Sequence, residues 1–154
     1  MFSRLHRCLE DVKILIDSHS LGNDISCKKI TTNKKTVLSI VDNLAGEMHV
    51  IADMVPDSHT DIRLVLLLTP EIPEQDRAFL EYLHYLVRIT GGSHIGLKEE
   101  SHDNNLVQYV AYVRFTWARE AELGTLLEMH LGYLRTFYAR YADDINNNLM
   151  FSEM

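Results

Sequence analysis

The chain has 154 residues, of which 46% are hydrophobic, and it carries a formal net charge of −7 at pH 7. This length predicts a single domain that buries roughly 70% of the surface exposed by its unfolded chain. The acidic balance disfavours nucleic acid as a partner, because phosphate backbones and an acidic surface repel each other, and it disfavours acidic partners in the same way.

The N-terminal third of the chain is predicted to form a helix and a β-hairpin. Apolar residues recur at steps of four, three and four, which predicts a helix over residues 2–17. Residues 18–35 are mostly polar and indicate a loop with room for a short edge strand. Residues 36–41 and 47–54 are predicted strands of one hairpin, because β-branched and alternating apolar side chains flank a turn-forming segment.

The stretch from residue 61 to residue 92 is the predicted centre of the fold. Residues 64–68 are apolar without interruption, so a strand here has no polar face. We therefore expect this strand to lie in the middle of a sheet and to be covered on both sides. A helix is predicted to follow from Pro73, and its apolar spacing continues until Gly91 and Gly92 end it.

Two further strands and a long helix complete the predicted elements. Alternating apolar residues indicate a weak strand over residues 94–99 and a stronger one over 106–115. Thr116 is a candidate N-cap of a final helix whose apolar stripe repeats for about five turns, and the polar residues 143–148 are expected to loosen it. The predicted domain covers residues 1–145, followed by a short tail over 146–154.

The order of these elements predicts the fold class. Written as α-β-β-β-α-β-β-α, it indicates an α+β fold with a mainly antiparallel, twisted five-stranded sheet and helices packed on one side. Sequential strands joined by short turns favour antiparallel neighbours.

The same order carries a resemblance to a known family over residues 5–141. Its most specific parts are RLVLLLTP from residue 63, LVRITGGSHIGL from residue 86 and HLGYLRTFYARY from residue 130. These segments resemble the type III secretion chaperones (CesT-like) and, more closely, the YbjN-like proteins that share their fold. The resemblance implies a small acidic protein, often a dimer, that binds an extended or helical partner segment in apolar grooves and catalyses no reaction. It does not imply a secretion system.

The predicted helix after Pro73 has apolar side chains around much of its circumference. A helix of this kind buries a second surface in addition to the one facing its own core. We predict that Tyr82, Tyr85 and Ile89 form this surface and contact a second copy of the chain or a partner protein. A homodimer is therefore expected.

The strand over residues 47–54 supplies the second predicted binding surface. Met48, Val50 and Met54 share one face of this strand, and methionine side chains adapt to varied apolar partners. We predict that these three residues form an apolar binding surface for a partner, which we call the β-strand surface. An added partner strand is expected to pair near residues 36–41 or 106–115, as sheet edges.

Motifs for catalysis, metals and cofactors are missing from the sequence. The eight histidines are scattered without a His-Glu-x-x-His pattern, and Cys8 and Cys27 have no metal-ligand spacing. There is no nucleophile elbow and no glycine-rich phosphate loop before a helix. We therefore predict no catalytic residue, no metal and no cofactor.

Three functional hypotheses follow from the sequence. The first is a cytoplasmic, non-enzymatic chaperone or adaptor that holds a segment of another protein; reduced cysteines and the lack of a membrane-length apolar run favour the cytoplasm. The second is an acidic inhibitor or immunity-type protein that caps a basic partner. The third is a small enzyme that uses His94, His102 and Asp103, which could meet across one hairpin.

Overall fold

A computed structural model gives the fold and describes residues 10, 12–14, 25–31, 36–43, 47–54, 61–73, 77–101, 106–117 and 120–147. The elements are β1 (Ile25–Thr31), β2 (Thr36–Asp42), β3 (Met48–Met54), β4 (Asp61–Pro73), α2 (Arg77–Thr90), the 3-10 helix η2 (Gly92–His94), β5 (Gly96–Ser101), β6 (Leu106–Thr116) and α3 (Glu120–Asn146). Residues 10 and 12–14 are helical, in agreement with the predicted first helix. The other residues of that predicted helix lie outside the described ones.

In these ranges six strands form one antiparallel sheet, in the order β1-β2-β3-β4-β6-β5. The predicted meander is confirmed as β2, β3 and β4, each paired with the next. The prediction of five strands is too low by one. The additional strand is β1, which lies in the segment expected to be a loop with room for a short edge strand. The α+β class with an antiparallel sheet is confirmed.

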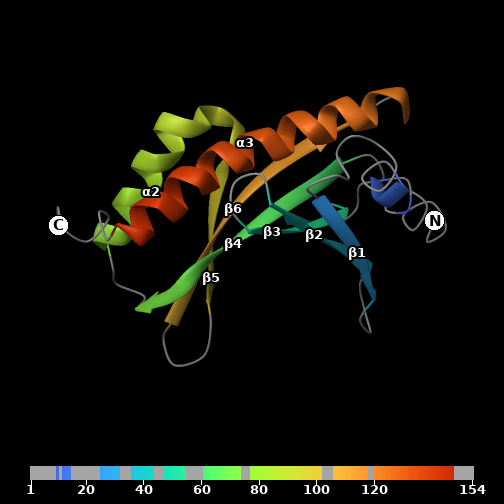
Figure 1. The fold of residues 1–154 in the computed structure, drawn as a ribbon. Helices are drawn as coiled ribbons and strands as arrows, with labels where there is room; N and C mark the ends of the chain where they lie inside the picture. Colours follow the sequence, from blue (N-terminus) through green and yellow to red (C-terminus); the bar gives the residue numbers. More distant parts are fainter. Residues whose placement is uncertain are drawn as a thin grey trace.

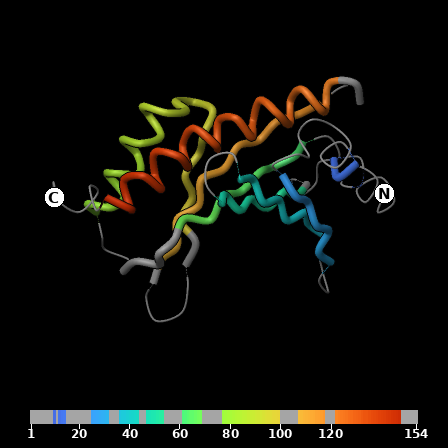
Figure 2. The backbone as a smooth tube through the Cα atoms, in the orientation of Figure 1, coloured from blue at the N-terminus to red at the C-terminus, as the bar shows by residue number. Residues whose placement is uncertain are grey.

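Helices α2 and α3 lie on the same side of the sheet (Figure 1), as the prediction of one-sided packing requires. The backbone trace shows the same layering, with both helices above the strands (Figure 2). We call the sheet face toward α2 and α3 the inner face and the opposite one the outer face. Because side chains alternate along a strand, every second residue of each strand faces inward.

The inner face and the two helices enclose the hydrophobic core. Along β4 the inward residues are Ile62, Leu64, Leu66 and Leu68, all of them buried. They belong to one cluster with the apolar stripe of α3, which includes Leu127, Leu131, Leu134 and Phe137. Removal of these side chains from water is the main driving force for the layered arrangement.

Helix α3 differs from the prediction at both of its ends. Thr116 does not cap it, because Thr116 ends β6 and its hydroxyl donates a hydrogen bond to Oδ1 of Asp61 at 2.6 Å. The helix begins at Glu120 and continues to Asn146, through polar residues that were expected to loosen it. Asp144 is buried in this segment and accepts hydrogen bonds from Tyr82 of α2 and Arg140 of α3. These contacts hold the last turns of α3 against α2. No helix in the described part of the chain combines the length and the apolar character needed to cross a membrane.

A buried ion pair joins α3 to β2. Asp42 is fully buried on the inner face, and Nε of Arg135 donates a hydrogen bond to its carboxylate. Tyr138, one turn further along α3, donates to the backbone carbonyl of Glu47 at 3.3 Å. An unpaired carboxylate at the position of Asp42 would be strongly destabilising, so this pair fixes where α3 crosses the β2–β3 end of the sheet.

The edges of the sheet are not where they were predicted. Residues 36–41 belong to β2, which lies between β1 and β3, and residues 106–115 belong to β6, which lies between β4 and β5. The edge strands are instead β1 and β5. The missed strand β1 accounts for the first error, and the placement of β5 outside β6 accounts for the second.

The turn after α2 generates the first testable prediction. Helix α2 ends at Thr90, as expected from Gly91 and Gly92, and Gly92 has a φ of +55°. No atom lies within 4 Å of where a Cβ would be, so only backbone conformation opposes a side chain there. We expect Gly92→Ala to lower the free energy of unfolding by about 1 kcal/mol, measured by urea denaturation.

Asparagine tolerates the left-handed region better than alanine, so Gly92→Asn is the matched comparison and should be less destabilising. Equal stability of Gly92→Ala and the unsubstituted chain would show that this turn is not held in the left-handed conformation.

Candidate functional site

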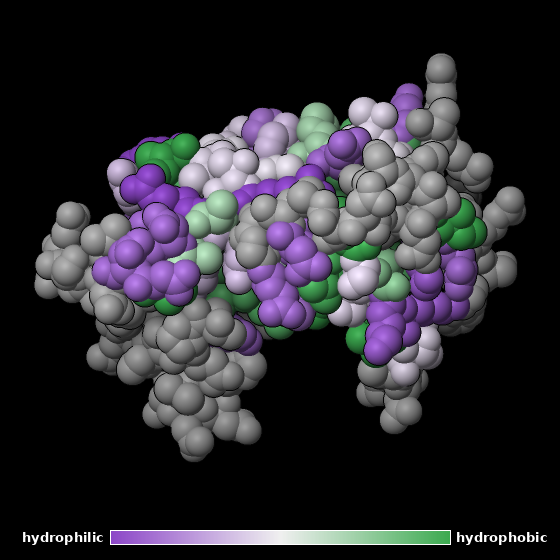
Figure 3. Space-filling view, in the orientation of Figure 1, coloured by the Kyte–Doolittle hydropathy of each residue, from purple (hydrophilic) through white to green (hydrophobic). Residues whose placement is uncertain are grey.

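The outer face of the sheet carries apolar side chains that α2 and α3 do not cover. Val65 and Leu67 point outward from β4, Ile51 from β3 and Tyr112 from β6. Leu67 is 39% exposed, and the other three are half-buried. Figure 3 shows hydrophobic residues along the lower edge of the molecule, on the strand side. We call Ile51, Val65, Leu67 and Tyr112 the outer patch.

The register of the strands makes the outer patch continuous. Ile51 pairs with Val65, and Val65 pairs with Tyr112, so these three form one row across β3, β4 and β6. Leu67 pairs with Val110 in the neighbouring row, and Val110 is buried. Side chains in directly opposed positions lie about 5 Å apart and pack against one another.

This arrangement corrects one expectation about the central strand. The structure places β4 in the interior of the sheet, as predicted, with β3 and β6 as its neighbours, but its two faces differ in burial. Val65 is half-buried and Leu67 is exposed, whereas the inward residues of the same strand are buried. An uninterrupted apolar run therefore indicates here one core face and one apolar surface, not two covered faces.

Ion pairs border the outer patch on one side. Arg63 donates to both carboxylate oxygens of Asp53, with Nη2 and Oδ2 3.0 Å apart. Arg114 donates to Asp61, which also accepts the hydroxyl of Thr116. Arg63 and Arg114 are directly opposed in the register, and like charges in such positions repel. The two aspartates therefore neutralise a repulsion within the sheet.

The other side of the patch ends at a glycine. Gly96 of β5 pairs with Tyr112, and a Cβ at Gly96 would lie 2.4 Å from Cζ of the tyrosine ring. The ring therefore lies across the position that any other side chain would fill. Gly96 allows the Tyr112 ring to lie flat over β5, so the patch extends toward that edge of the sheet.

The structure does not expose the predicted β-strand surface of Met48, Val50 and Met54. Met48 and Val50 point to the inner face and are fully buried in the core. The side chain of Met54 lies outside the described ones. The residues of β3 and β4 that do reach the outer face are Ile51, Val65 and Leu67. Met48 and Val50 do share one face of β3, as predicted, but it is the inner face, which packs into the core.

The predicted surface of α2 divides into two parts. Tyr85 and Ile89 are 47% and 46% exposed and lie on the side of α2 away from the sheet. The guanidinium carbon of Arg88 lies 5.8 Å from the centre of the Tyr85 ring, within the range of a cation–π contact. Tyr82 instead points toward α3, so it does not belong to the same exposed face.

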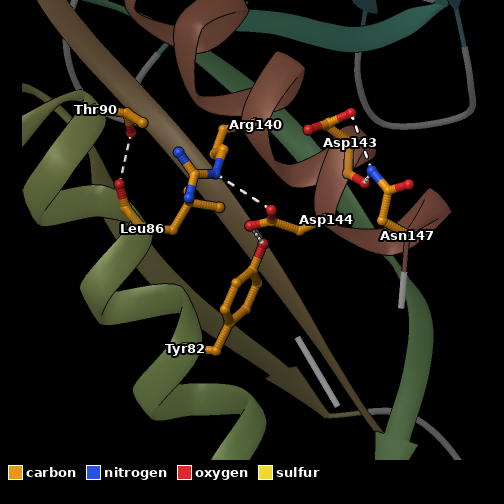
Figure 4. A network of polar contacts seen from close by, with 7 residues as sticks. All are labelled: Tyr82, Leu86, Thr90, Arg140, Asp143, Asp144 and Asn147. Carbon is orange, nitrogen blue, oxygen red and sulfur yellow. Dashed lines mark hydrogen bonds and ion pairs between the residues drawn. The ribbon is translucent and has the colours of Figure 1, made fainter. Parts of the chain in front are cut away.

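Tyr82 links the two helices through a buried carboxylate (Figure 4). Its hydroxyl donates to Oδ2 of Asp144 at 2.6 Å, and Nε of Arg140 donates to Oδ1 at 3.2 Å. Burial raises the pKa of Tyr82 well above its ordinary value, and the hydrogen bond to Asp144 raises it further. Burial acts in the same direction on the pKa of Tyr141. These contacts favour a structural role for Tyr82.

The described histidines do not assemble a catalytic group. His94 stacks on Tyr133 with ring centres 4.2 Å apart, and His130 stacks on Phe115 at 4.5 Å. Nδ1 of His130 lies 2.7 Å from the carbonyl oxygen of Leu126, to which it can donate. These contacts favour a packing role for His130. His102 and Asp103, the other members of the proposed hairpin trio, lie outside the described residues.

The sequence pointed to the position of the outer patch without naming it. Val65 and Leu67 belong to the apolar run over residues 64–68. In a strand with one exposed face these two positions would be polar, so their apolar side chains indicate an apolar surface. Ile51 and Tyr112 give weaker signals, because each lies on the outward phase of a strand whose inward phase is more apolar.

The Tyr82–Asp144 hydrogen bond generates the second prediction. Tyr82→Phe removes one donor from a buried carboxylate, so we expect the free energy of unfolding to fall by about 1–2 kcal/mol at neutral pH. Tyr138→Phe is the matched control, because its hydrogen bond is longer and exposed, and it should cost less. Urea denaturation measures both changes.

The same variant has a pH signature. Tyrosine has an ordinary pKa of 10.0 in the unfolded chain, and the pKa of folded Tyr82 is higher. Below pH 10 neither state loses the proton; above it the unfolded state loses it first, so stability falls as pH rises. Tyr82→Phe should make this fall shallower. An unchanged alkaline slope would contradict the assigned burial of the hydroxyl.

Comparison with known proteins gives information on the fold. No protein-family model and no curated protein sequence matches the chain. Among solved structures, the crystal structure of YbjN from E. coli, a proposed transcription regulator, matches with a TM-score of 0.55 and 10% sequence identity over 88% of this chain and 92% of that one. At this identity the likeness shows the fold alone. The resemblance seen in the sequence is confirmed as a YbjN-like fold, and the narrower likeness to CesT-like secretion chaperones stays a prediction.

Proposed function

We propose that this chain is a non-enzymatic, cytoplasmic binding protein, a chaperone or adaptor that holds an extended or helical segment of a partner protein. The observation that supports this function is the outer patch, with four apolar side chains in contiguous register positions on a face that α2 and α3 leave open. Contiguous apolar surface on a folded domain is typical of a protein-binding site.

The shape of the patch also favours a macromolecule over a small ligand. Small-molecule sites are concave and enclose most of the ligand, whereas the outer patch is the face of a sheet. The ion pairs Asp53–Arg63 and Asp61–Arg114 lie beside it, giving an apolar centre with a polar border. Protein interfaces have this anatomy.

Leu67 is the most exposed member of the patch and provides the third prediction. We expect Leu67→Glu to weaken binding of an apolar partner segment at least tenfold, because it places a charge in the centre of the buried interface. Met129→Glu is the matched control: Met129 is 44% exposed but lies on α3, on the other side of the sheet. Peptide binding can be measured by fluorescence anisotropy.

Leu67→Gln serves as a second variant in case the glutamate destabilises the sheet, and circular dichroism verifies the fold of each. Equal affinity in Leu67→Glu, Leu67→Gln and the unsubstituted chain would remove the outer patch as the binding surface.

A homodimer through α2 is the second part of the proposal. Tyr85 and Ile89 are one helical turn apart and equally exposed, so a second copy could pack against both. The exposed face of α2 also carries Glu81, His84 and Arg88, so this interface would combine apolar anchors with polar contacts.

The dimer proposal gives the fourth prediction. Tyr85→Glu and Ile89→Glu should each shift the mass in solution from dimer to monomer, because a buried carboxylate would meet its symmetry mate across the interface. Met129→Glu again serves as the control. Sedimentation equilibrium measures the mass, and an unchanged mass in both α2 variants would exclude this interface.

The alternative function is an acidic inhibitor or immunity-type protein that caps a basic partner. The net charge of −7 supports it, since charge of that size speeds association with a cationic surface. The two functions differ in the surface used, because the first uses the apolar outer patch and the second uses acidic surface.

A further inference from the structure

The charge around the outer patch differs from the charge of the chain as a whole. Lys28 on β1 and Lys98 on β5 are exposed and lie on the outward phase of their strands, on opposite sides of the patch. Arg114 lies beside Tyr112 on β6 with 55% of its side chain exposed, whereas its partner Asp61 is 13% exposed. The guanidinium of Arg114 therefore reaches solvent at this border, whereas the carboxylate with which it pairs is mostly buried.

The Arg63–Asp53 pair repeats this asymmetry. The carboxylate of Asp53 is nearly buried, and the guanidinium of Arg63 is the more exposed partner. Glu47 stands at one corner of the sheet, where it lies 3.7 Å from His49. Among the described side chains around the patch, the exposed charge is thus mainly positive, although the net charge of the chain is −7. The expectation that acidic partners are disfavoured therefore does not hold for this face.

Backbone hydrogen bonding decides what kind of segment the face can cover. A sheet face presents side chains, so an extended segment lying on it would lose water from backbone groups without gaining partners for them. A helix satisfies its backbone groups internally. The inner face of the same sheet is covered by a helix, α3.

The dimensions of the patch fit a short helix. It covers two strand spacings, about 10 Å, from β3 to β6, and two residues along β4, about 7 Å. Two to three helical turns of 5.4 Å span these distances. Lys28 and Lys98 lie on the two edge strands, so a helix of about four turns, which continues past the patch on both sides, is needed to bring its ends near both lysines.

We infer that the outer patch binds an amphipathic helix of a partner protein whose apolar stripe packs on Ile51, Val65 and Leu67 and whose flanking acidic residues pair with Lys28, Lys98 and Arg114. This inference rests on the proposed function and adds the conformation and the charge of the partner segment. The apolar stripe supplies contact area, and the acidic flanks select this face of an otherwise acidic protein.

A display library of amphipathic peptides tests this inference on the full chain. Each peptide has 14 residues, a fixed leucine stripe and flanking positions that vary among Glu, Lys and Gln. We expect selection on the unsubstituted chain to enrich Glu at the flanks and binding of the enriched peptides to weaken as salt increases. Circular dichroism should show that they become helical on binding.

Charge-reversal variants provide the control. Lys28→Glu and Lys98→Glu should each weaken an acidic-flanked peptide about fivefold at low salt, since attraction is replaced by repulsion. Arg77→Glu makes the same change of charge on α2 and should have a smaller effect. If Lys98→Glu and Arg77→Glu had equal effects, the preference for acidic flanks would come from the net charge of the protein and not from the residues around the patch. This result would overturn the inference.

The outcomes separate this inference from the function on which it rests. Binding that Leu67→Glu abolishes, but without enrichment of Glu at the flanks, would support the outer patch and refute the acidic partner. Bound peptides that stay non-helical would refute the helix. A library from which no Leu67-dependent peptide is recovered would contradict the proposed function itself.

Discussion

The pairing of β4 with β6 is the interaction on which the rest of the structure depends. Their antiparallel register runs from Asp61 opposite Thr116 to Pro73 opposite Leu106, with one irregularity between Leu68 and Ile72. A slip of one residue would move every side chain of a strand to the other face. The register thus decides that Leu64 and Leu66 meet α3, whereas Val65 and Leu67 form the outer patch. Asp61, which binds both Arg114 and Thr116 across the pair, favours this register over its neighbours.

Much of the fold could be predicted from the sequence, because period and turn chemistry are local signals. The meander, the two helices and the end of α2 at Gly91–Gly92 follow from apolar spacing and glycine. Strand β1 was harder to recognise, because it has only two strongly apolar residues and gains its conformation from pairing with β2. Thr116 was misassigned for a related reason: a threonine that can cap a helix can equally end a strand, and its bond to the distant Asp61 decided the outcome.

The binding surface was harder to predict than the fold. Alternation shows which residues of a strand share a face, but it does not show which face the helices cover. The sequence predicts Met48 and Val50 at the surface, but both lie in the core, whereas Ile51, between Val50 and Ala52, belongs to the outer patch. The same holds for Tyr82 on α2, since helical spacing does not show which of its apolar residues another element covers. Its neighbours Tyr85 and Ile89 are exposed, but Asp144, 62 residues later in the chain, accepts a hydrogen bond from Tyr82 and holds it against α3.

The partial burial of the outer patch explains why charge should matter to its partner. Complete burial of a large apolar side chain contributes about 1.5–3 kcal/mol, and Ile51, Val65 and Tyr112 are already more than half buried, so covering them adds less than about 1 kcal/mol each. Association costs at least about 4 kcal/mol in lost freedom of motion. The apolar area of this protein therefore does not offset that cost alone, and the partner's own apolar stripe must supply the remainder. Because many apolar stripes could do so, Lys28, Lys98 and Arg114 are the groups that can distinguish one partner from another.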